Sequence, residues 1–221
     1  MIIIHENLPN EAKSTAEVIK QVYGLDSKII GEDLGNQFAP IPEFNGYRYS
    51  YLLELQASFQ GKALLVLTPR DIYVGDSKND DWIFGYNTGN LSVVSTARIK
   101  RWDSQPSDVI GVPLDLYLKR LSVMDIHEIG HDVVSGNHFQ PAKWVNIQSG
   151  HELDLGPHCT DNTCAMYEIV DIKSPTKSEG HMLLGQDKKF DAGLDDVIAR
   201  LSPRWFCDKC YSSISIDERY K

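Results

Sequence analysis

Five residues near the middle of the chain combine two histidines and a glutamate at a spacing suited to metal chemistry. They read HEIGH, from His127 to His131. On an α-helix, residues four positions apart lie only about 40° from each other around the axis, so both imidazoles can reach one ion. Glu128 lies beside them and can deprotonate a water activated by the metal without being a ligand itself. The pattern predicts a catalytic zinc site with Glu128 as the general base.

A zinc ion that keeps one position open for chemistry needs a third protein ligand. The downstream candidates are His138, His151 and His158. In the long motif H-E-x-x-H-x-x-G-x-x-H the last histidine would fall at Asn137, so His138 misses that position by one residue. His151 lies in the segment SGHELD, which is typical of an exposed turn. The spacing alone therefore leaves the third ligand open.

All four cysteines lie in the last third of the chain, in two close pairs. Cys159 and Cys164 form a C-x4-C pair, and Cys207 and Cys210 form a C-x-x-C pair. In a chain without a secretion signal, four thiolates are more typical of a tetrahedral metal site than of disulfides. Two disulfides are the alternative in a secreted chain. We expect a metal site formed by the four thiolates.

The elements that must position these residues begin as alternating strands and helices. Apolar runs and amphipathic periods predict the order strand, helix, strand, helix, strand. The strands are predicted at residues 1–5, 27–31 and 62–69, and the helices at 11–23 and 47–59. Residues 33–46 are rich in proline, glycine and asparagine and are predicted to be a loop. This order argues for an α/β sheet.

Two more strands and a long helix are predicted around HEIGH. The strands cover residues 82–87 and 91–99 and are joined by turn residues. The second could be an edge strand that holds an extended peptide by main-chain hydrogen bonds, or an ordinary sheet strand. The helix has Pro113 in its first turn, carries HEIGH and is expected to end by Gly136.

The C-terminal third has weaker patterns. Residues 137–158 are polar with scattered aromatic side chains, and residues 168–190 also lack a clear period. Residues 189–202 are amphipathic and predict a helix. The last ten residues, SSISIDERYK, are too short to carry chemistry. We expect one catalytic domain in two parts: residues 1–136 with the sheet and the HEIGH helix, and residues 137–221 with the cysteines.

Composition excludes several classes of partner. The formal net charge is −9, from 31 acidic and 22 basic residues. This balance disfavours nucleic acid or an anionic membrane surface, because phosphate binding needs clustered lysine and arginine. No run of about 18 apolar residues is present, so no membrane span is expected. The first residues, MIIIHENLPNEAK, lack the basic head and long apolar centre of a secretion signal, which predicts a cytoplasmic protein.

The segment that follows the third candidate histidine carries a family resemblance. Residues 153–167 read LDLGPHCTDNTCAMY, in which His158 is followed directly by C-x4-C-x-M, and CDKC follows later. Together with HEIGH, this string resembles the archaemetzincins, a branch of the metzincin clan of zinc peptidases. Their pattern runs HExxHxxGxxH-C-x4-C-x-M and ends in CxxC, and all four cysteines fall in the family's places. The resemblance covers roughly residues 62–210.

The resemblance implies a metzincin-like α/β fold with a mixed sheet, an active-site helix and a small zinc-stapled C-terminal part. It implies two zinc ions, one catalytic and one structural. The residues that match the family's ligands of the catalytic zinc are His127, His131 and His158, and those that match its structural zinc ligands are Cys159, Cys164, Cys207 and Cys210. Glu128 matches the family's general base. Met166 matches the methionine of the turn beneath the metal, which is a hydrophobic floor and not a ligand.

Two insertions separate this chain from the family pattern. Between His131 and His158 lie 26 residues where the family has five, and between Met166 and Cys207 lie 40 where it has about 17. The cost of closing a loop grows only slowly with its length, so ligands can stay in place across such insertions. We expect the insertions, residues 133–155 and 168–190, to flank the site.

The sequence thus predicts a zinc metallopeptidase that hydrolyses peptide bonds in a peptide or protein substrate. Water activated by zinc and deprotonated by Glu128 would attack the carbonyl, without a covalent enzyme intermediate. The alternative is a zinc-stabilised peptide-binding protein of the same ancestry that has lost turnover, which the long insertion before His158 motivates. A disulfide-held extracellular domain is the third possibility.

Overall fold

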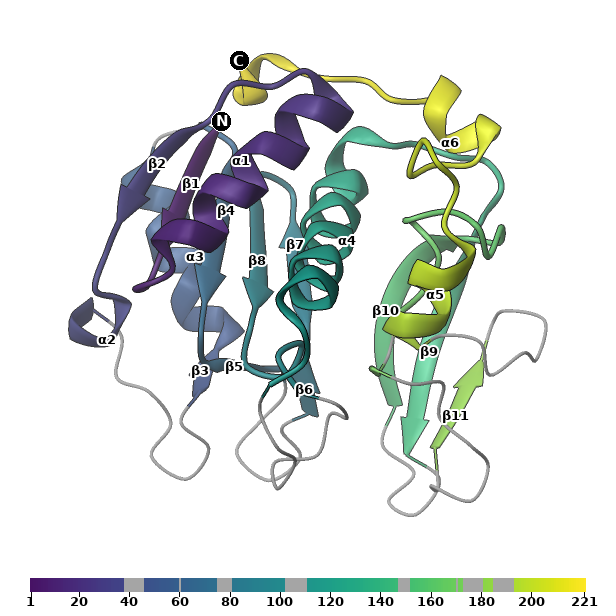
Figure 1. Ribbon diagram of the computed structural model, residues 1–221, viewed down its shortest axis with the longest axis horizontal. Helices are drawn as coiled ribbons and strands as arrows, with labels where there is room; N and C mark the ends of the chain where they lie inside the picture. The colour runs from purple at the N-terminus through teal and green to yellow at the C-terminus, as the bar shows by residue number, and fades with distance from the viewer. Residues whose placement is uncertain are drawn as a thin grey trace. The chain divides into compact units, whose positions relative to one another are not determined.

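The computed structural model describes residues 1–37, 46–59, 61–74, 81–101, 111–146, 152–169, 171–172, 181–184 and 193–221. These residues form two compact units. The first unit comprises Met1–Val133 and Ser215–Lys221, and the second comprises Val134–Ile214. Both units contain strands and helices (Figure 1), so the chain has the mixed α/β character that its sequence predicts.

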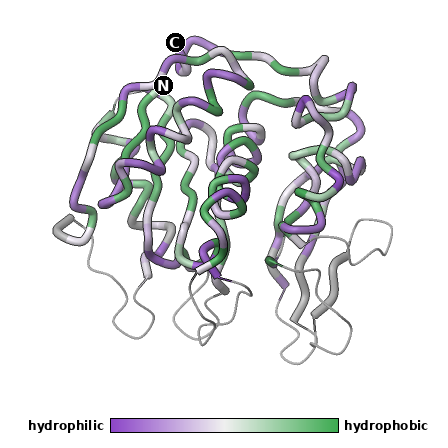
Figure 2. Tube along the Cα trace, in the orientation of Figure 1, coloured by the Kyte–Doolittle hydropathy of each residue, from purple (hydrophilic) through white to green (hydrophobic). Residues whose placement is uncertain are grey.

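The first unit is built on a five-stranded sheet. Its strand order is β2-β1-β4-β8-β7. The strands are β1 (Ile2–His5), β2 (Lys28–Gly31), β4 (Leu64–Thr68), β7 (Gly85–Thr88) and β8 (Leu91–Ser95). All neighbouring pairs are parallel except β7 with β8, which is antiparallel. Every residue of β4 and β8 is buried, as expected for central strands covered on both faces, and Figure 2 shows the hydrophobic residues along these strands.

Helices cover both faces of this sheet. They are α1 (Pro9–Tyr23), α2 (Leu34–Gln37), α3 (Tyr49–Ser58) and α4 (Leu114–Val133). α1 and α4 pack against each other on one face, and α3 lies on the other (Figure 1). On the α3 face, Leu52 packs with the strand residues Ile4, Val66 and Val93. The predicted alternation of strands and helices from residue 1 to residue 69 is therefore confirmed, with two added elements: the short helix α2 inside the segment predicted to be a loop, and a short strand, β3 (Gly46–Arg48), where the helix of residues 47–59 was expected to begin.

A second sheet corrects the prediction of one strand over residues 82–87. The segment is interrupted at Phe84 and forms two strands, β6 (Asp81–Ile83) and β7. These strands belong to different sheets. β6 pairs with β5 (Asp71–Val74), which also pairs with β3 (Gly46–Arg48). Phe84 is buried at the break. A run of β-forming residues does not reveal the break, because both halves have the same local preference.

The strand predicted over residues 91–99 is shorter and lies elsewhere than at an edge. β8 ends at Ser95 and lies between β4 and β7, so the interpretation as an edge strand is wrong and the ordinary sheet strand is confirmed. The edge of this sheet next to α4 is β7. The HEIGH helix is confirmed as α4, which ends at Val133, before the predicted limit at Gly136.

The second unit contains a three-stranded antiparallel sheet, where the sequence showed no clear pattern. Its order is β10-β9-β11, with β9 (Phe139–Asn146), β10 (Glu152–Cys159) and β11 (His181–Leu184). Residues 137–158, for which the sequence predicted no element, thus contain β9 and most of β10. Pro141 lies opposite Pro157 in this pairing, and proline donates no ladder hydrogen bond, which is why the segment does not read as a hairpin.

Two short helices complete the second unit. α5 (Leu194–Arg200) confirms the helix predicted at residues 189–202 in its central part, while residues 189–192 lie outside the described part of the chain. α6 (Asp208–Ser212) begins at the second cysteine pair, with Cys207 as its N-cap residue. The end of the chain returns to the first unit, where the carbonyl of Tyr220 accepts a hydrogen bond of 2.8 Å from the N-terminal amine of Met1. Among the described residues, no helix has the length and apolar character needed to cross a membrane.

Candidate metal centres

The two histidines of HEIGH lie side by side on α4 in the first unit. The Nε2 atoms of His127 and His131 are 3.2 Å apart, and their rings meet edge to face. Two nitrogens bound to one tetrahedral zinc ion at the usual Zn–N length lie about 3.3 Å apart. His127 is buried and His131 is half-buried. The pair therefore has the donor type and separation that a zinc ion requires.

Glu128 lies beside this pair and packs against the edge strand of the sheet. Its side chain is buried, and it passes so close to Gly85 of β7 that a Cβ at that position would lie 2.4 Å from Glu128 Oε1. Any other residue at position 85 would push the carboxyl away. Burial, with the neighbouring Asp125 carboxyl, raises the pKa of Glu128 well above its usual range. Gly85 is a site residue that the motif did not reveal.

Buried hydrogen bonds hold α4 against α1 just before HEIGH. Thr15 Oγ1 donates to Asp125 Oδ2 at 2.6 Å, and the Tyr23 hydroxyl donates to the Ile126 carbonyl at 2.7 Å. Asp125 is fully buried, and burial raises the pKa of its carboxyl to about 8 while the Thr15 hydrogen bond opposes this. An acidic residue on the apolar face of a predicted helix was the signal in the sequence for this contact.

Two further contacts fix the two ends of α4. Near its start, the fully buried Arg120 donates to the carbonyls of Ile99 and Arg101 at 2.9 and 2.6 Å. Near its end, the Tyr220 hydroxyl donates to Asp132 Oδ2 at 2.6 Å. The C-terminal tail, although too short to carry chemistry, therefore helps to position the helix that carries the histidine pair.

His158 and Met166 lie in the second unit. His158 is buried on β10, and its Nδ1 is 3.2 Å from the carbonyl oxygen of Gly156. Because a carbonyl can only accept, Nδ1 carries the proton and Nε2 is the nitrogen suited to a metal. Met166 is fully buried, and its carbonyl accepts a hydrogen bond of 2.9 Å from the N–H of Cys159. That His158 and Met166 join His127 and His131 around one ion remains a prediction.

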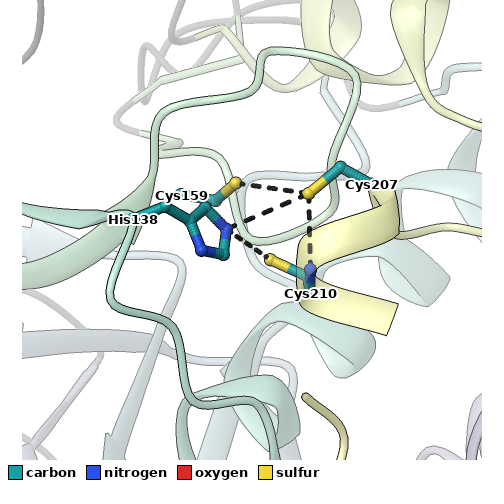
Figure 3. Close-up of side chains that lie close together, drawn as sticks. All are labelled: His138, Cys159, Cys207 and Cys210. Atoms are coloured by element: carbon teal, nitrogen blue, oxygen red, sulfur yellow. Dashed lines mark hydrogen bonds between the residues drawn. The ribbon is translucent and has the colours of Figure 1, made fainter. Parts of the chain in front are cut away.

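A second group of metal-binding side chains lies within the second unit. The ligand atoms of His138, Cys159, Cys207 and Cys210 all lie within 4.8 Å of one another. Figure 3 shows these four side chains converging, with the imidazole of His138 facing the sulfurs of the C-x-x-C pair. Cys159 and Cys210 are completely buried. The cysteines from the two distant pairs are thus brought together, as a shared metal site requires.

Cys164 is also fully buried, and its thiol interacts with two of these cysteines. The interactions with the side chains of Cys159 and Cys210 lower the pKa of the Cys164 thiol to about 3. The same contacts raise the pKa of the Cys159 and Cys210 thiols. A group of closely packed thiols does not readily lose more than one proton. A bound metal ion would displace the protons from all of its thiol ligands. All four cysteines are free, so neither of the two disulfides considered from the sequence is formed.

The structure separates the candidates for the third ligand. His138 lies with the thiols: its Nε2 is 3.2 Å from Cys210 Sγ and 4.0 Å from Cys207 Sγ. His151 lies outside the described residues. His158 as the partner of the histidine pair therefore stays a prediction. The place of His138 among the thiols is a feature that the cysteine spacing did not predict.

Comparison with known proteins identifies solved structures that have a similar fold. No protein-family model matches the chain, and no curated protein matches it. The archaemetzincin of Methanopyrus kandleri superposes with a TM-score of 0.55 at 20% identity, over 96% of this chain and 90% of the other. The archaemetzincin of Archaeoglobus fulgidus, solved with malonate, gives a TM-score of 0.57 at 20% identity over 96% and 99% of the two chains.

A zinc-dependent peptidase from Methanocorpusculum labreanum gives a TM-score of 0.60 at 16% identity, over 97% of this chain and 99% of that one. All three superpositions cover nearly the whole chain, so both units contribute to the likeness. The resemblance expected from the histidine and cysteine motifs is thereby confirmed at the level of the fold: the chain has the fold of the archaemetzincins.

Proposed function

We propose that this protein is a zinc-dependent peptidase that hydrolyses peptide bonds in a peptide or protein substrate. The observation that carries this proposal is the pair of Nε2 atoms 3.2 Å apart on α4, with a buried glutamate between the two histidines in sequence. Histidines one helical turn apart with an adjacent carboxylate are the arrangement used for zinc-assisted hydrolysis. The fold shared with zinc-dependent peptidases supports the same reading.

The ligands proposed for the catalytic zinc ion are His127, His131 and His158. All three offer a neutral imidazole nitrogen, which zinc prefers, and three protein ligands leave one position for chemistry. When bound, zinc would polarise the scissile carbonyl and lower the pKa of a water molecule to near 7. Met166 is proposed to form the apolar floor of this site, because it is fully buried and follows His158 by eight residues in the sequence.

Glu128 is proposed to carry the proton in this reaction. It would accept a proton from the attacking water and pass it to the nitrogen of the leaving amine. Its carboxyl is positioned by Gly85, whose missing side chain leaves room for it against β7. Because α4 carries Glu128 and both histidines, the distance between base and metal is fixed by one rigid element.

The edge strand β7 is proposed to hold the substrate. It lies at the end of the five-stranded sheet and contacts α4. An edge strand presents a row of main-chain N–H and C=O groups that can pair with an extended peptide. A peptide added to this edge would run past Gly85 and hence past the Glu128 carboxyl. Sequence selectivity would then come from side-chain contacts and not from the main chain.

The cysteine cluster is proposed to hold a second, structural zinc ion. Its donors come from the end of β10, from the loop that follows and from the start of α6. A closed site of this kind couples metal binding to folding, because the thiolates have no shared position in the unfolded chain. It would staple the C-terminal segment to the second unit.

The test compares the wild type with Glu128→Gln on a mixed peptide library, with cleavage read by mass spectrometry and zinc by elemental analysis. We expect the variant to keep both zinc ions and to lose cleavage by a factor of about 10² to 10⁴, because a general base is removed. Glu17→Gln, at an exposed position on α1, is the matched control and should cleave like the wild type. Equal cleavage by Glu128→Gln and the wild type would show that the glutamate is not the base.

The same experiment addresses the alternative of a binding protein that has lost turnover. That protein would retain peptides from the library without cutting them, and its Glu128→Gln variant would retain the same peptides. The long insertion before His158 motivates this alternative, and it contains β9 and the start of β10.

A further inference from the structure

We propose that His138 is a ligand of the second metal ion, which would make that centre a three-cysteine, one-histidine site in place of the four-cysteine site expected from the sequence. The other ligands would be Cys159, Cys207 and Cys210. The inference concerns only the structural metal and goes beyond the proposed peptidase activity, so it can fail while the peptidase assignment stands, and the reverse.

The distances within the cluster match one tetrahedral zinc ion. With the usual Zn–S and Zn–N lengths, two sulfurs on the same zinc lie about 3.8 Å apart, and a sulfur and a nitrogen about 3.6 Å apart. The sulfurs of Cys159 and Cys207 are 3.8 Å apart. The Nε2 of His138 is 3.2 Å from Cys210 Sγ and 4.0 Å from Cys207 Sγ, which bracket the second value. Small side-chain adjustments would therefore complete the site.

The backbone before β9 is shaped to hold the imidazole of His138 in place. A Cβ at Gly136 would lie 2.6 Å from His138 Cε1 and 2.7 Å from its Nδ1, so only glycine leaves room for the ring. A tight turn closes there, with the Phe139 N–H bonded to the Gly136 carbonyl at 3.1 Å. The Phe139 ring contacts the imidazole edge to face at 5.1 Å. The orientation of His138 toward the thiols is thus fixed by its surroundings.

Five donors compete for four positions, and charge favours the imidazole over the fourth thiolate. Zinc with three thiolates and one neutral imidazole carries a net charge of about −1, and with four thiolates about −2. The three cysteines of the site are buried, and the cost of burying a charge rises steeply with its size. Cys164 would then stay beside the site without binding the metal.

This assignment gives the insertion before His158 a structural purpose. His138 comes directly before β9, which forms a hairpin with β10. A metal bound to His138 would therefore tie the start of this hairpin to its end at Cys159 and to α6 at Cys210. In the four-cysteine alternative, the start of the hairpin would lack this anchor.

Cobalt substitution distinguishes the two sites, because the intensity of the sulfur-to-cobalt charge-transfer absorption counts the thiolates on the ion. A site of three histidines adds nothing to that absorption, so the full chain can be used. We expect the intensity of three thiolates in the wild type. His138→Ala combined with Cys164→Ser, which removes the ligand and the donor that could replace it, should weaken cobalt binding at this centre by more than about 100-fold relative to Cys164→Ser alone, since loss of even an outer-sphere partner costs 10–100-fold. His138→Cys should bind and show the intensity of four thiolates.

Matched variants separate a ligand from a neighbour. Cys164→Ser should keep the three-thiolate absorption and bind cobalt within a few-fold of the wild type. Gly136→Ala should weaken binding, because the added Cβ displaces the imidazole, whereas Ser135→Ala at the exposed adjacent position should not. A wild-type intensity of four thiolates, or of none, would overturn the proposal whatever the variants do, and this readout needs no variant to fold.

Discussion

His127 and His131 lie one helical turn apart on a single element, whereas His138, Cys159 and the C-x-x-C pair come from separate segments of the second unit. The first pair is set in place by helix geometry and by hydrogen bonds from α1 and the C-terminal tail. The cysteine cluster has no such element in common. It brings together the end of β10 and the start of α6, which are separated in the sequence by about a fifth of the chain.

The two groups of metal-binding side chains differ in what a metal ion would contribute to the unit that holds it. In the first unit, a buried five-stranded sheet and its helices hold the histidine pair, so a metal would add chemistry to an existing framework. In the second unit, few strands and short helices surround the cysteines, so a metal would supply much of the folding free energy. Variants of either unit therefore test this contrast.

The largest effect is expected from the double change Cys207→Ser and Cys210→Ser. Structural zinc contributes about 10–16 kcal/mol in small zinc-dependent folds, so the second unit should lose its protected structure. Hydrogen exchange should accelerate across residues 134–214, while amides of β1 and β4 keep their protection. Lys209→Ala, exposed on the same helix, is the control. Unchanged zinc content and unchanged exchange in the double variant would contradict this side of the comparison.

The second-largest effect is expected from Glu168, whose protonation makes the free energy of unfolding depend on pH. It is buried in the second unit, and neither carboxylate oxygen has a hydrogen-bond partner among the described residues. Burial raises the pKa of Glu168 to about 8. The folded state therefore holds the proton more tightly than the unfolded state, so the contribution of Glu168 to stability is fully present below about pH 4.5 and is lost as the pH rises to about 8.

Glu168→Gln removes this dependence. At pH 8 the variant should be more stable than the wild type by as much as about 4 kcal/mol, and at pH 4.5 the two should be similar. Urea unfolding of the metal-loaded protein at both pH values measures the difference. Glu152→Gln, at an exposed position on β10, should show no such gain. A difference that is the same at both pH values would mean that the charge of Glu168 is not its cause.

Gly85→Ala is expected to reduce peptide cleavage by about 10²-fold, or about 3 kcal/mol, with both zinc ions retained. The added Cβ would clash with the Glu128 carboxyl, and displacement of a catalytic group by about 1 Å has a cost of this order. The effect should fall on kcat. Gly31→Ala on β2, at the opposite edge of the same sheet, has a looser contact and should cleave normally. Full activity in Gly85→Ala would show that Glu128 does not need this contact.

The smallest effect is expected from Thr15→Val in the first unit. This change keeps the shape of the side chain and removes the hydrogen bond to Asp125, at a cost of about 1–2 kcal/mol. Because the framework of this unit does not depend on metal, the loss should be the same with and without zinc, as measured by urea unfolding. Ser14→Ala, on the same helix, is the control. A loss seen only in the zinc-free protein would mean that the first unit also relies on metal for its fold.

Much of the first unit follows from local patterns. Continuous apolar runs gave the central strands, and the 3.6-residue period gave α1 and α4. The sequence did not reveal the switch between sheets at Phe84, because β6 and β7 have the same strand preference on either side of it. It also could not decide between an edge and an interior position for β8, since that depends on which strand arrives next to it.

The hairpin of β9 and β10 was harder to predict. Prolines interrupt its ladder, and only Ala142 among its first five residues is buried, so neither period nor propensity identifies it. The imidazole of His138 was considered only as a partner of the HEIGH pair. Its place beside Cys210 depends on the turn at Gly136 and on the path of the hairpin.

The sequence by itself determined the histidine pair and its glutamate, because four residues of helix fix their relative positions without help from the rest of the chain. It also indicated that cysteines of the two pairs would meet, through a spacing shared with a known family. Only the tertiary structure decided that Gly85 makes room for Glu128 and that His138 joins the thiols. Those contacts join residues from distant segments, and their distances depend on how whole elements pack, which no local spacing encodes.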